Sequence, residues 1–237
     1  MHQNSADDLP RRIGDLLEKA SHCNNEGRFQ DTAVLVDEAR RLATDNIQAL
    51  AEIDLFCAVA LLEQGHREQG LQALGAILVK HDPWLNTAEG RPVYEAIQVH
   101  KAFSRKHLQK NLEAKPLLEE ATQFELGAEV RSDVHCHLGC CYHELGLYTL
   151  AREQFERANA LGVSEDWESV FHYYYGYTLY ELTEFQQAKR EFILCLQSGS
   201  SGPEPTLRHA MLAAVCRKLG EHSEAAAFEQ QAKSLKS

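Results

Sequence analysis

The chain has 237 residues, of which 44% are apolar and 25% are charged, a composition typical of helical proteins that are soluble. Its formal net charge of −11 argues against nucleic acid and anionic membrane surfaces as partners. No apolar run approaches the roughly 20 residues of a membrane-spanning helix, and the N-terminal residues lack the basic-then-apolar order of a signal peptide. We therefore expect a cytoplasmic protein with no membrane insertion.

The N-terminal part of the chain predicts a short tail and two helix pairs. Residues 1–8 are polar and are expected to form a disordered tail. Apolar residues then recur at helical spacing. The expected helices are Leu9–Asn25 with Arg28–Thr44, and Ile47–Gln64 with Arg67–His81. Gly27 and Gly65 lie where the paired helices reverse, a place that favours left-handed backbone and therefore glycine.

The connection that follows is longer than its counterparts. The helix of the second pair is expected to end at Asp82, because the residue before a proline resists helical geometry. The chain from there to Arg91 is then expected as a surface loop. Corresponding positions are 44 residues apart here, from Ala58 to Ala102, so the connection carries an insertion. The third pair is expected as helices Val93–Lys110 and Leu112–Phe124.

The clearest regularity lies between Val134 and Gly199, where two copies of one helix-turn-helix pattern follow each other. Equivalent residues are 37 apart: Gly139 and Gly176, Ala151 and Ala188, Phe155 and Phe192. A fixed period with the same residue types at the same offsets marks a repeat architecture. Ser132 and Ser164 are expected to cap the first helix of each copy.

These residues resemble the tetratricopeptide repeat, whose pattern is Leu-Gly and Tyr on a first helix, then Ala, an aromatic residue and Ala on a second. The resemblance implies an all-α, right-handed superhelical solenoid of about six helix-turn-helix repeats, forming a single domain over residues 9–237. The repeats are expected at 13–46, 51–84, 95–128, 132–165, 169–202 and 206–237, and the third fits the pattern worst. The last helix is polar and is expected to act as its own cap.

In this family the first helix of each pair lines a concave groove that binds a peptide or protein segment. Carried over to this chain, the groove residues are Val99, Phe103, His107, Cys136, Cys140, His143, Tyr173, Tyr177, Tyr180 and Arg217. The three tyrosines are spaced four and three apart and form one helical stripe. Tyrosine combines apolar area with a polar tip, which suits an interface anchor. The alternative is that the stripe packs between repeats.

The stretch HCHLGCCYH, residues 135–143, raises a zinc hypothesis because it crowds Cys and His on one helix. Cys136 and His143 are seven residues apart, roughly 10 Å along the axis. Ligand bonds of about 2.0–2.3 Å do not easily let both join Cys140 on one metal. No Cys-x-x-Cys pair occurs, so we assign no metal and no cofactor. Seven cysteines, mostly at small core positions, indicate reduced thiols.

Three histidines, His135, His172 and His209, share one repeat position. We expect them to be partly buried, hydrogen-bonded aromatic residues. The sequence contains no nucleophile elbow, P-loop, dinucleotide fingerprint or HExxH, so no catalytic residue is assigned.

The resemblance implies a non-enzymatic adaptor or scaffold that binds a peptide or protein segment. The alternative is a regulatory or sensor module, which would respond to metal or redox state through residues 135–143 or control a larger signalling protein. Self-association into a homo-oligomer stays open.

Overall fold

A computed structural model describes residues 8–198 and 203–235, and within these ranges it contains thirteen α-helices and no strand. Except for its last residue, the expected tail over residues 1–8 lies outside the described ranges. The chain divides into two compact units, Met1–Leu108 and Gln109–Ser237, which are described separately as unit 1 and unit 2. In the described part of the chain, no helix combines the length and the hydrophobicity that crossing a bilayer requires.

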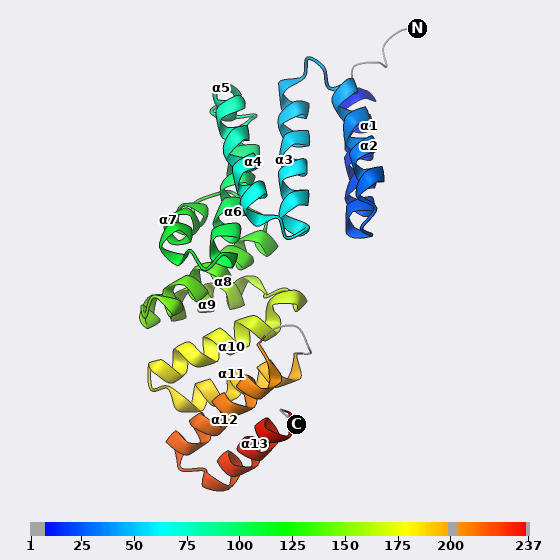
Figure 1. Cartoon of the computed structure of the whole chain (residues 1–237). Coiled ribbons are helices and arrows are strands. Elements are labelled where there is room, and N and C mark those ends of the chain that lie inside the picture. Colours follow the sequence, from blue (N-terminus) through cyan, green and yellow to red (C-terminus); the bar gives the residue numbers. More distant parts are fainter. Residues whose placement is uncertain (1–7, 199–202, 236–237) are drawn as a thin grey trace. The chain divides into compact units, whose positions relative to one another are not determined.

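Unit 1 contains the first two expected helix pairs (Figure 1). Its helices are α1 (Asp8–Asn25), α2 (Phe29–Leu42), α3 (Ile47–Glu63), α4 (Arg67–Lys80), α5 (Asp82–Leu85) and α6 (Arg91–His107). The periodic apolar residues form the core between them, including Ile13, Ala20 and Ile53. Asn46 caps α3, because its side chain accepts a hydrogen bond of 3.0 Å from the backbone N–H of Ala49.

The connection expected as a loop contains a one-turn helix, α5, so that part of the prediction is wrong. Pro83 stands in its first turn, where a missing N–H costs nothing. Leu85 is only 3% exposed and joins the core cluster that includes Ile97 of α6. The apolar side chain therefore anchors the inserted residues to unit 1.

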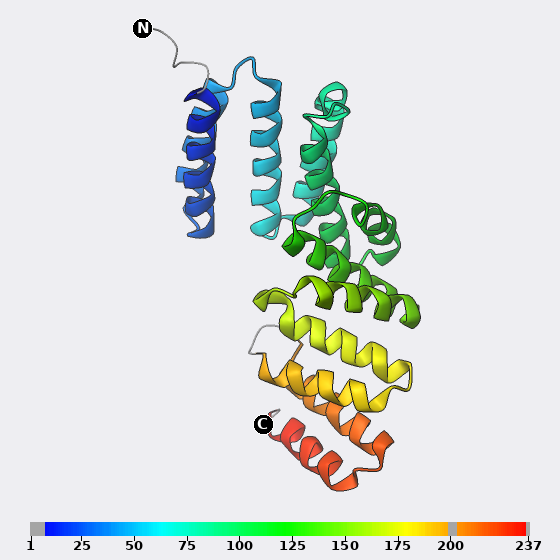
Figure 2. The same cartoon turned by 180° about the vertical axis from the view of Figure 1, so that it is seen from behind.

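Unit 2 is built from stacked antiparallel helix pairs (Figure 2). Its helices are α7 (Asn111–Ala121), α8 (Ala128–Glu144), α9 (Tyr148–Leu161), α10 (Glu165–Glu181), α11 (Phe185–Gln197), α12 (Pro205–Leu219) and α13 (His222–Ser234). The repeated glycine and phenylalanine meet inside the fourth pair (α8 and α9) and the fifth pair (α10 and α11). A Cβ atom at Gly139 would lie 2.8 Å from the ring of Phe155, and one at Gly176 would lie 3.2 Å from Phe192. Close packing explains why these positions repeat.

The turn inside each helix pair shows that one register runs through the chain. A residue one or two positions after the end of the first helix has a positive φ in all six pairs, between 58° and 83°. These residues are Gly27, Gly65, Gln109, Gly146, Thr183 and Gly220. The expected turn glycines are therefore confirmed. Gln109 stands at the same place in the third pair, where the sequence pattern is weakest.

The two expected helix caps have different outcomes. Ser164 stands at the N-cap position of α10, as predicted, but its side chain makes no capping hydrogen bond. The prediction for Ser132 is wrong, because α8 begins a turn earlier, at Ala128. Ser132 is fully buried inside the helix, and its hydroxyl donates to the carbonyl oxygen of Ala158 at 3.2 Å. It therefore joins the two helices of its pair.

Ion pairs with the same 37-residue period join successive pairs in unit 2. Arg152 of α9 contacts Glu184, at the start of α11, at 2.9 Å. Lys189 of α11 contacts Glu221, at the start of α13, at 2.6 Å. Each bond links the second helix of one pair to the second helix of the next, so it supports the stacking.

Candidate functional site

The three histidines at one repeat position pack within their own helix pairs, as predicted. Each meets a partner 19 residues downstream: Gln154 at 2.8 Å from His135, Glu191 at 2.7 Å from His172, and the ring of Phe228 with its centroid 6.3 Å from that of His209. Burial lowers the pKa of His135, so its neutral form is favoured. These histidines have a structural role between the paired helices.

The cysteines and histidines of α8 point to separate partners instead of one centre. His137 meets the ring of Trp167 edge-on at 4.5 Å, and the Nδ1 atom of His143 lies 3.0 Å from the hydroxyl of Thr178. Cys136 is fully buried, and burial raises the pKa of its thiol to about 12. Such a thiol stays protonated at neutral pH and is a poor metal ligand or nucleophile. This geometry gives the sensor alternative no support.

One group in the described residues brings three potential metal ligands within 4.8 Å of one another, and it lies elsewhere: Cys216, Glu221 and Glu224. The ammonium of Lys189 donates to both carboxylates, at 2.6 Å to Glu221 and 2.8 Å to Glu224. These hydrogen bonds hold the pKa of Lys189 above its usual value. The lysine therefore already supplies the positive charge, and the group is an ion-pair cluster between α11 and α13.

The predicted tyrosine stripe divides into a buried member and two partly exposed ones. Tyr173 is 7% exposed and lies with its ring 6.0 Å from that of Phe192. Burial raises the pKa of Tyr173 to about 12. Tyr177 and Tyr180 are partly buried, and their ring centroids are 6.4 Å apart. The packing alternative therefore describes Tyr173, while Tyr177 and Tyr180 keep accessible surface.

The other predicted groove residues are divided in the same way. Five of the ten are less than 9% exposed: Val99, Cys136, Cys140, His143 and Tyr173. His143 shows the reason, because it faces Tyr174 and Thr178 on the first helix of the following pair. Positions spaced by four and three on a first helix thus meet the next pair. Phe103 is partly buried, and His107 and Arg217 are exposed. As folded, the five buried residues offer little surface to a partner.

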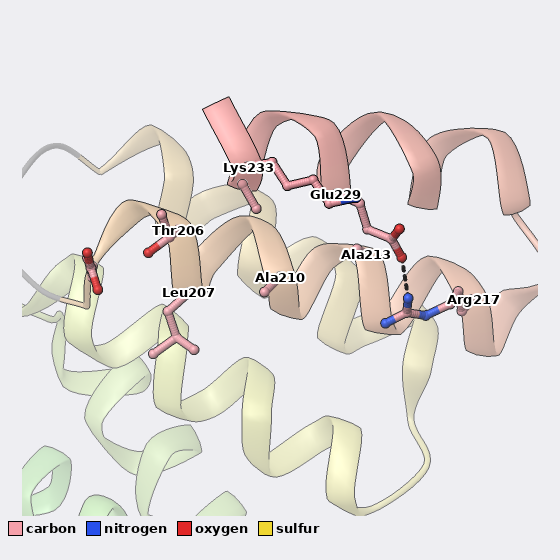
Figure 3. Close-up of a pocket in the computed structure, with 9 residues that line it drawn as sticks. Thr206, Leu207, Ala210, Ala213, Arg217, Glu229 and Lys233 are labelled. Atoms are coloured by element: carbon pink, nitrogen blue, oxygen red, sulfur yellow. Dashed lines mark hydrogen bonds and ion pairs between the residues drawn. The ribbon is translucent and has the colours of Figure 1, made fainter. Parts of the chain in front are cut away.

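A hollow of about 500 Å³ lies between α12 and α13 (Figure 3). Its lining is made of small residues on both helices and charged residues around them: Ala210, Ala213, Ala232, Leu207, Arg217, Glu229 and Lys233, with Glu204 and Thr206 at one end. Arg217 and Glu229 form an ion pair across it. Ala210 and Arg217 were both expected from the repeat pattern as groove positions of the sixth repeat, while Ala213 and Ala232 were not. The signal in the sequence is that Ala210 stands where the previous repeat has the much larger Tyr173.

No protein-family model matches the chain, and no curated protein matches it. Solved structures do match. PilF from Pseudomonas aeruginosa is 16% identical with a TM-score of 0.74, covering 96% of this chain and 93% of that one. BtubC from P. vanneervenii is 18% identical with a TM-score of 0.62, covering 98% and 92%. The apo quorum sensor NprR from B. thuringiensis is 16% identical with a TM-score of 0.67, covering 94% and 64%. The chain therefore has a tetratricopeptide-like, all-α repeat fold.

Proposed function

We propose that this tetratricopeptide-like chain is a non-enzymatic scaffold that binds a protein or peptide segment on a partly exposed aromatic surface, which its fifth helix pair (α10 and α11) forms together with the start of α9 in the fourth pair. That surface consists of Tyr148, Tyr177, Tyr180 and Glu181, and is called the tyrosine surface below. The similarity of the whole chain to tetratricopeptide-type structures supports a protein-binding role in general. The position of the site rests on the residues of this chain.

The observation that carries the proposal is that Tyr177 and Tyr180 remain partly exposed on a helix whose core positions are already filled. Tyr177 contacts the ring of His143 at 4.8 Å, and that histidine contacts Tyr148 at 5.5 Å. The rings of Tyr177 and Tyr148 thus both pack against one buried residue, and the ring of Tyr180 packs against Tyr177 and Phe185. Fixed tyrosines with an exposed face bring large contact area at a small cost in side-chain entropy, as interface anchors require.

Charge favours a basic partner segment at this surface. Glu181 is exposed one turn after Tyr177, and, after burial, its carboxylate is the strongest cause that raises the pKa of that tyrosine. Lys and Arg side chains are attracted both to the carboxylate and to the faces of the rings. The net charge of −11 acts in the same direction at longer range.

The thiols support a reducing compartment, and the cytoplasm is the placement we propose. All seven cysteines are free, and six of them are buried. Reduced thiols at core positions are usual where glutathione and thioredoxin keep cysteine reduced.

The proposal is tested by capture of partners from a lysate of the source cells, with Tyr177→Ala compared with the unchanged chain. Loss of an anchor at the centre of an interface should weaken binding by about 2 kcal/mol or more. Phe29→Ala is the matched control, because Phe29 is 51% exposed on α2, outside the surface. Helicity and thermal melting verify that both variants are folded, and affinity for each captured protein is then measured with purified material.

Equal affinity of the Tyr177→Ala and Phe29→Ala variants for every captured protein would contradict the proposed site. Tyr173 is not substituted, since truncation of a residue that is 7% exposed would disturb the core as well.

A further inference from the structure

The hollow between α12 and α13 occupies positions that are equivalent to a packed interface one repeat earlier. A shift of 37 residues relates Ala210 to Tyr173, Ala213 to Gly176, Glu229 to Phe192 and Ala232 to Cys195. Tyr173, Phe192 and Cys195 all belong to one buried core cluster. The hollow is therefore the sixth copy of a face that the fifth pair buries.

Wherever this face is buried, the first helix of the following pair covers it. α12 packs against both α10 and α11, and its residues Leu212 and Val215 are fully buried in the same cluster as Tyr173. One repeat earlier, α10 packs against α8 and α9. There Phe171 and Tyr175 each place a ring 5.7 Å from that of Phe155. The repeated face is therefore a binding surface, called the seat below, on which one helix packs against both helices of the preceding pair.

The sixth copy differs from the fifth in depth and charge. Alanine in place of Tyr173 leaves space above α12, and a volume of about 500 Å³ is within the range of roughly 300–1,000 Å³ that is usual for binding pockets. A carboxylate, Glu229, replaces Phe192 and is paired with Arg217. Lys233 is exposed at the rim and has no ion-pair partner among the residues the structure describes.

We propose that this hollow binds an amphipathic α-helix of another protein, which takes the place that α12 takes on the fifth pair. Its apolar face carries bulky side chains at helical spacing, because the alanine floor leaves room for them. An acidic side chain at its edge pairs with Lys233. The site is separate from the tyrosine surface and does not depend on it.

A second copy of this chain is a poor occupant, because its own first helix presents charge at the required positions. Counted back from the turn glycine, Leu212 and Val215 of α12 correspond to Lys19 and His22 of α1. Asp15 and Glu18 lie on the same side, and all four line a surface hollow of α1 and α2. An apolar floor would not compensate for the desolvation of these groups.

The test uses a fluorescently labelled synthetic peptide with the sequence of residues 204–221, since α12 is the helix that fills the equivalent seat. Fluorescence anisotropy against the full chain should show saturable binding. Ala210→Glu should weaken it at least tenfold, because a charged side chain then fills the floor. Ala226→Glu should leave it unchanged, since Ala226 is an exposed residue of α13 outside the hollow. Ala210 is exposed too, so both variants keep the fold.

Three results would overturn the inference. One is the lack of saturable binding by the peptide. The second is equal weakening by Ala210→Glu and Ala226→Glu. The third is a change in the sedimentation coefficient of the chain alone on Ala210→Glu, which would make a second copy the occupant.

Discussion

The fifth helix pair (α10 and α11) and the sixth (α12 and α13) each have a face formed by equivalent repeat positions. This face is buried in the fifth pair and open in the sixth. On the fifth pair, Tyr173 and Phe192 lie under α12 in a closed core. On the sixth, Ala210 and Glu229 line an open hollow. The repeat period decides where a side chain points, and it is the same in both. The size and charge of the side chains decide whether these positions form a packed apolar core or a hollow lined by charge.

The fourth pair adds a third state to the comparison. It has Phe155 where the fifth has Phe192, and both are fully buried. At a position that holds Val170 in the fifth pair and Leu207 in the sixth, however, it has the carboxylate of Asp133. One oxygen of Asp133 is buried with no hydrogen-bond partner in the described structure. One charged residue has thus entered an otherwise apolar position.

The largest expected difference between the two faces concerns the aromatic position itself. Phe192→Ala should lower the free energy of unfolding by about 3–5 kcal/mol, because it opens a cavity in a closed core. Glu229→Ala, at the equivalent place, should change it by less than about 1 kcal/mol, since it removes only an exposed ion pair with Arg217. Urea denaturation followed by far-UV circular dichroism measures both.

A similar loss from both substitutions would break the comparison, because Glu229 would then contribute as much to the core as Phe192. The two substituted positions lie on equivalent turns of α11 and α13. A difference between the two changes in the free energy of unfolding therefore does not arise from their place in the helix.

The charged position of the fourth pair predicts a dependence on pH. Burial, together with the neighbouring Glu129 and Asp166, raises the pKa of Asp133 to about 6 from an ordinary 3.8. The folded state therefore binds more protons than the unfolded state between these values, and stability falls as the pH rises through this window. Above it the penalty is about 1–2 kcal/mol, after screening at a partly exposed site is allowed for.

Asp133→Asn should remove this penalty. The variant should be more stable than the unchanged chain by about 1–2 kcal/mol at pH 7.5, and by only a small fraction of this at pH 4, where the penalty has just begun to develop. Urea denaturation at the two pH values measures the difference. Asp166→Asn is the matched comparison and should give a smaller gain, because burial is the larger cause of the shift. An equal gain from Asp133→Asn at both pH values would exclude ionisation as the reason.

Much of the fold could be predicted, because periodic spacing and turn residues are local properties of the sequence. The first helix pairs needed only the helical spacing of apolar residues, the later pairs the 37-residue period, and the turn glycines the preference of glycine for positive φ. The start of α8 was missed because Ser132 resembles a cap, and only the partner helix shows that its hydroxyl reaches Ala158. The helix α5 was missed because Leu85 is fixed by packing against residues of another helix.

The candidate sites were harder to predict for the same physical reason. Whether Tyr173 or Tyr177 is exposed depends on how the following pair covers the stripe, and no periodicity within one helix contains that information. The alanines of the last hollow had to be compared with the fifth pair before their small size had a meaning. Family resemblance gave the positions, and the neighbours in space decided the exposure.

The smallest expected effect tests whether the turns are equivalent in energy as well as in position. Thr183 has φ 63° at the place where Gly146 has φ 73°. Both close the turn in the same way: the N–H of Thr183 donates to Tyr180 at 3.0 Å, and that of Gly146 to His143 at 2.9 Å. A β-branched residue with left-handed backbone is strained by about 1–2 kcal/mol.

Thr183→Gly should therefore raise the free energy of unfolding by about 0.5–1 kcal/mol, because relief of this strain exceeds the added entropy of glycine in the unfolded chain. Gly146→Thr should lower it by a similar amount, since a Cβ atom at Gly146 meets nothing within 4 Å and only the backbone is strained. Urea denaturation of both variants gives opposite signs if the turns are equivalent. A loss of stability in Thr183→Gly would mean that the threonine side chain itself stabilises the fifth pair, and that this turn differs from its neighbours.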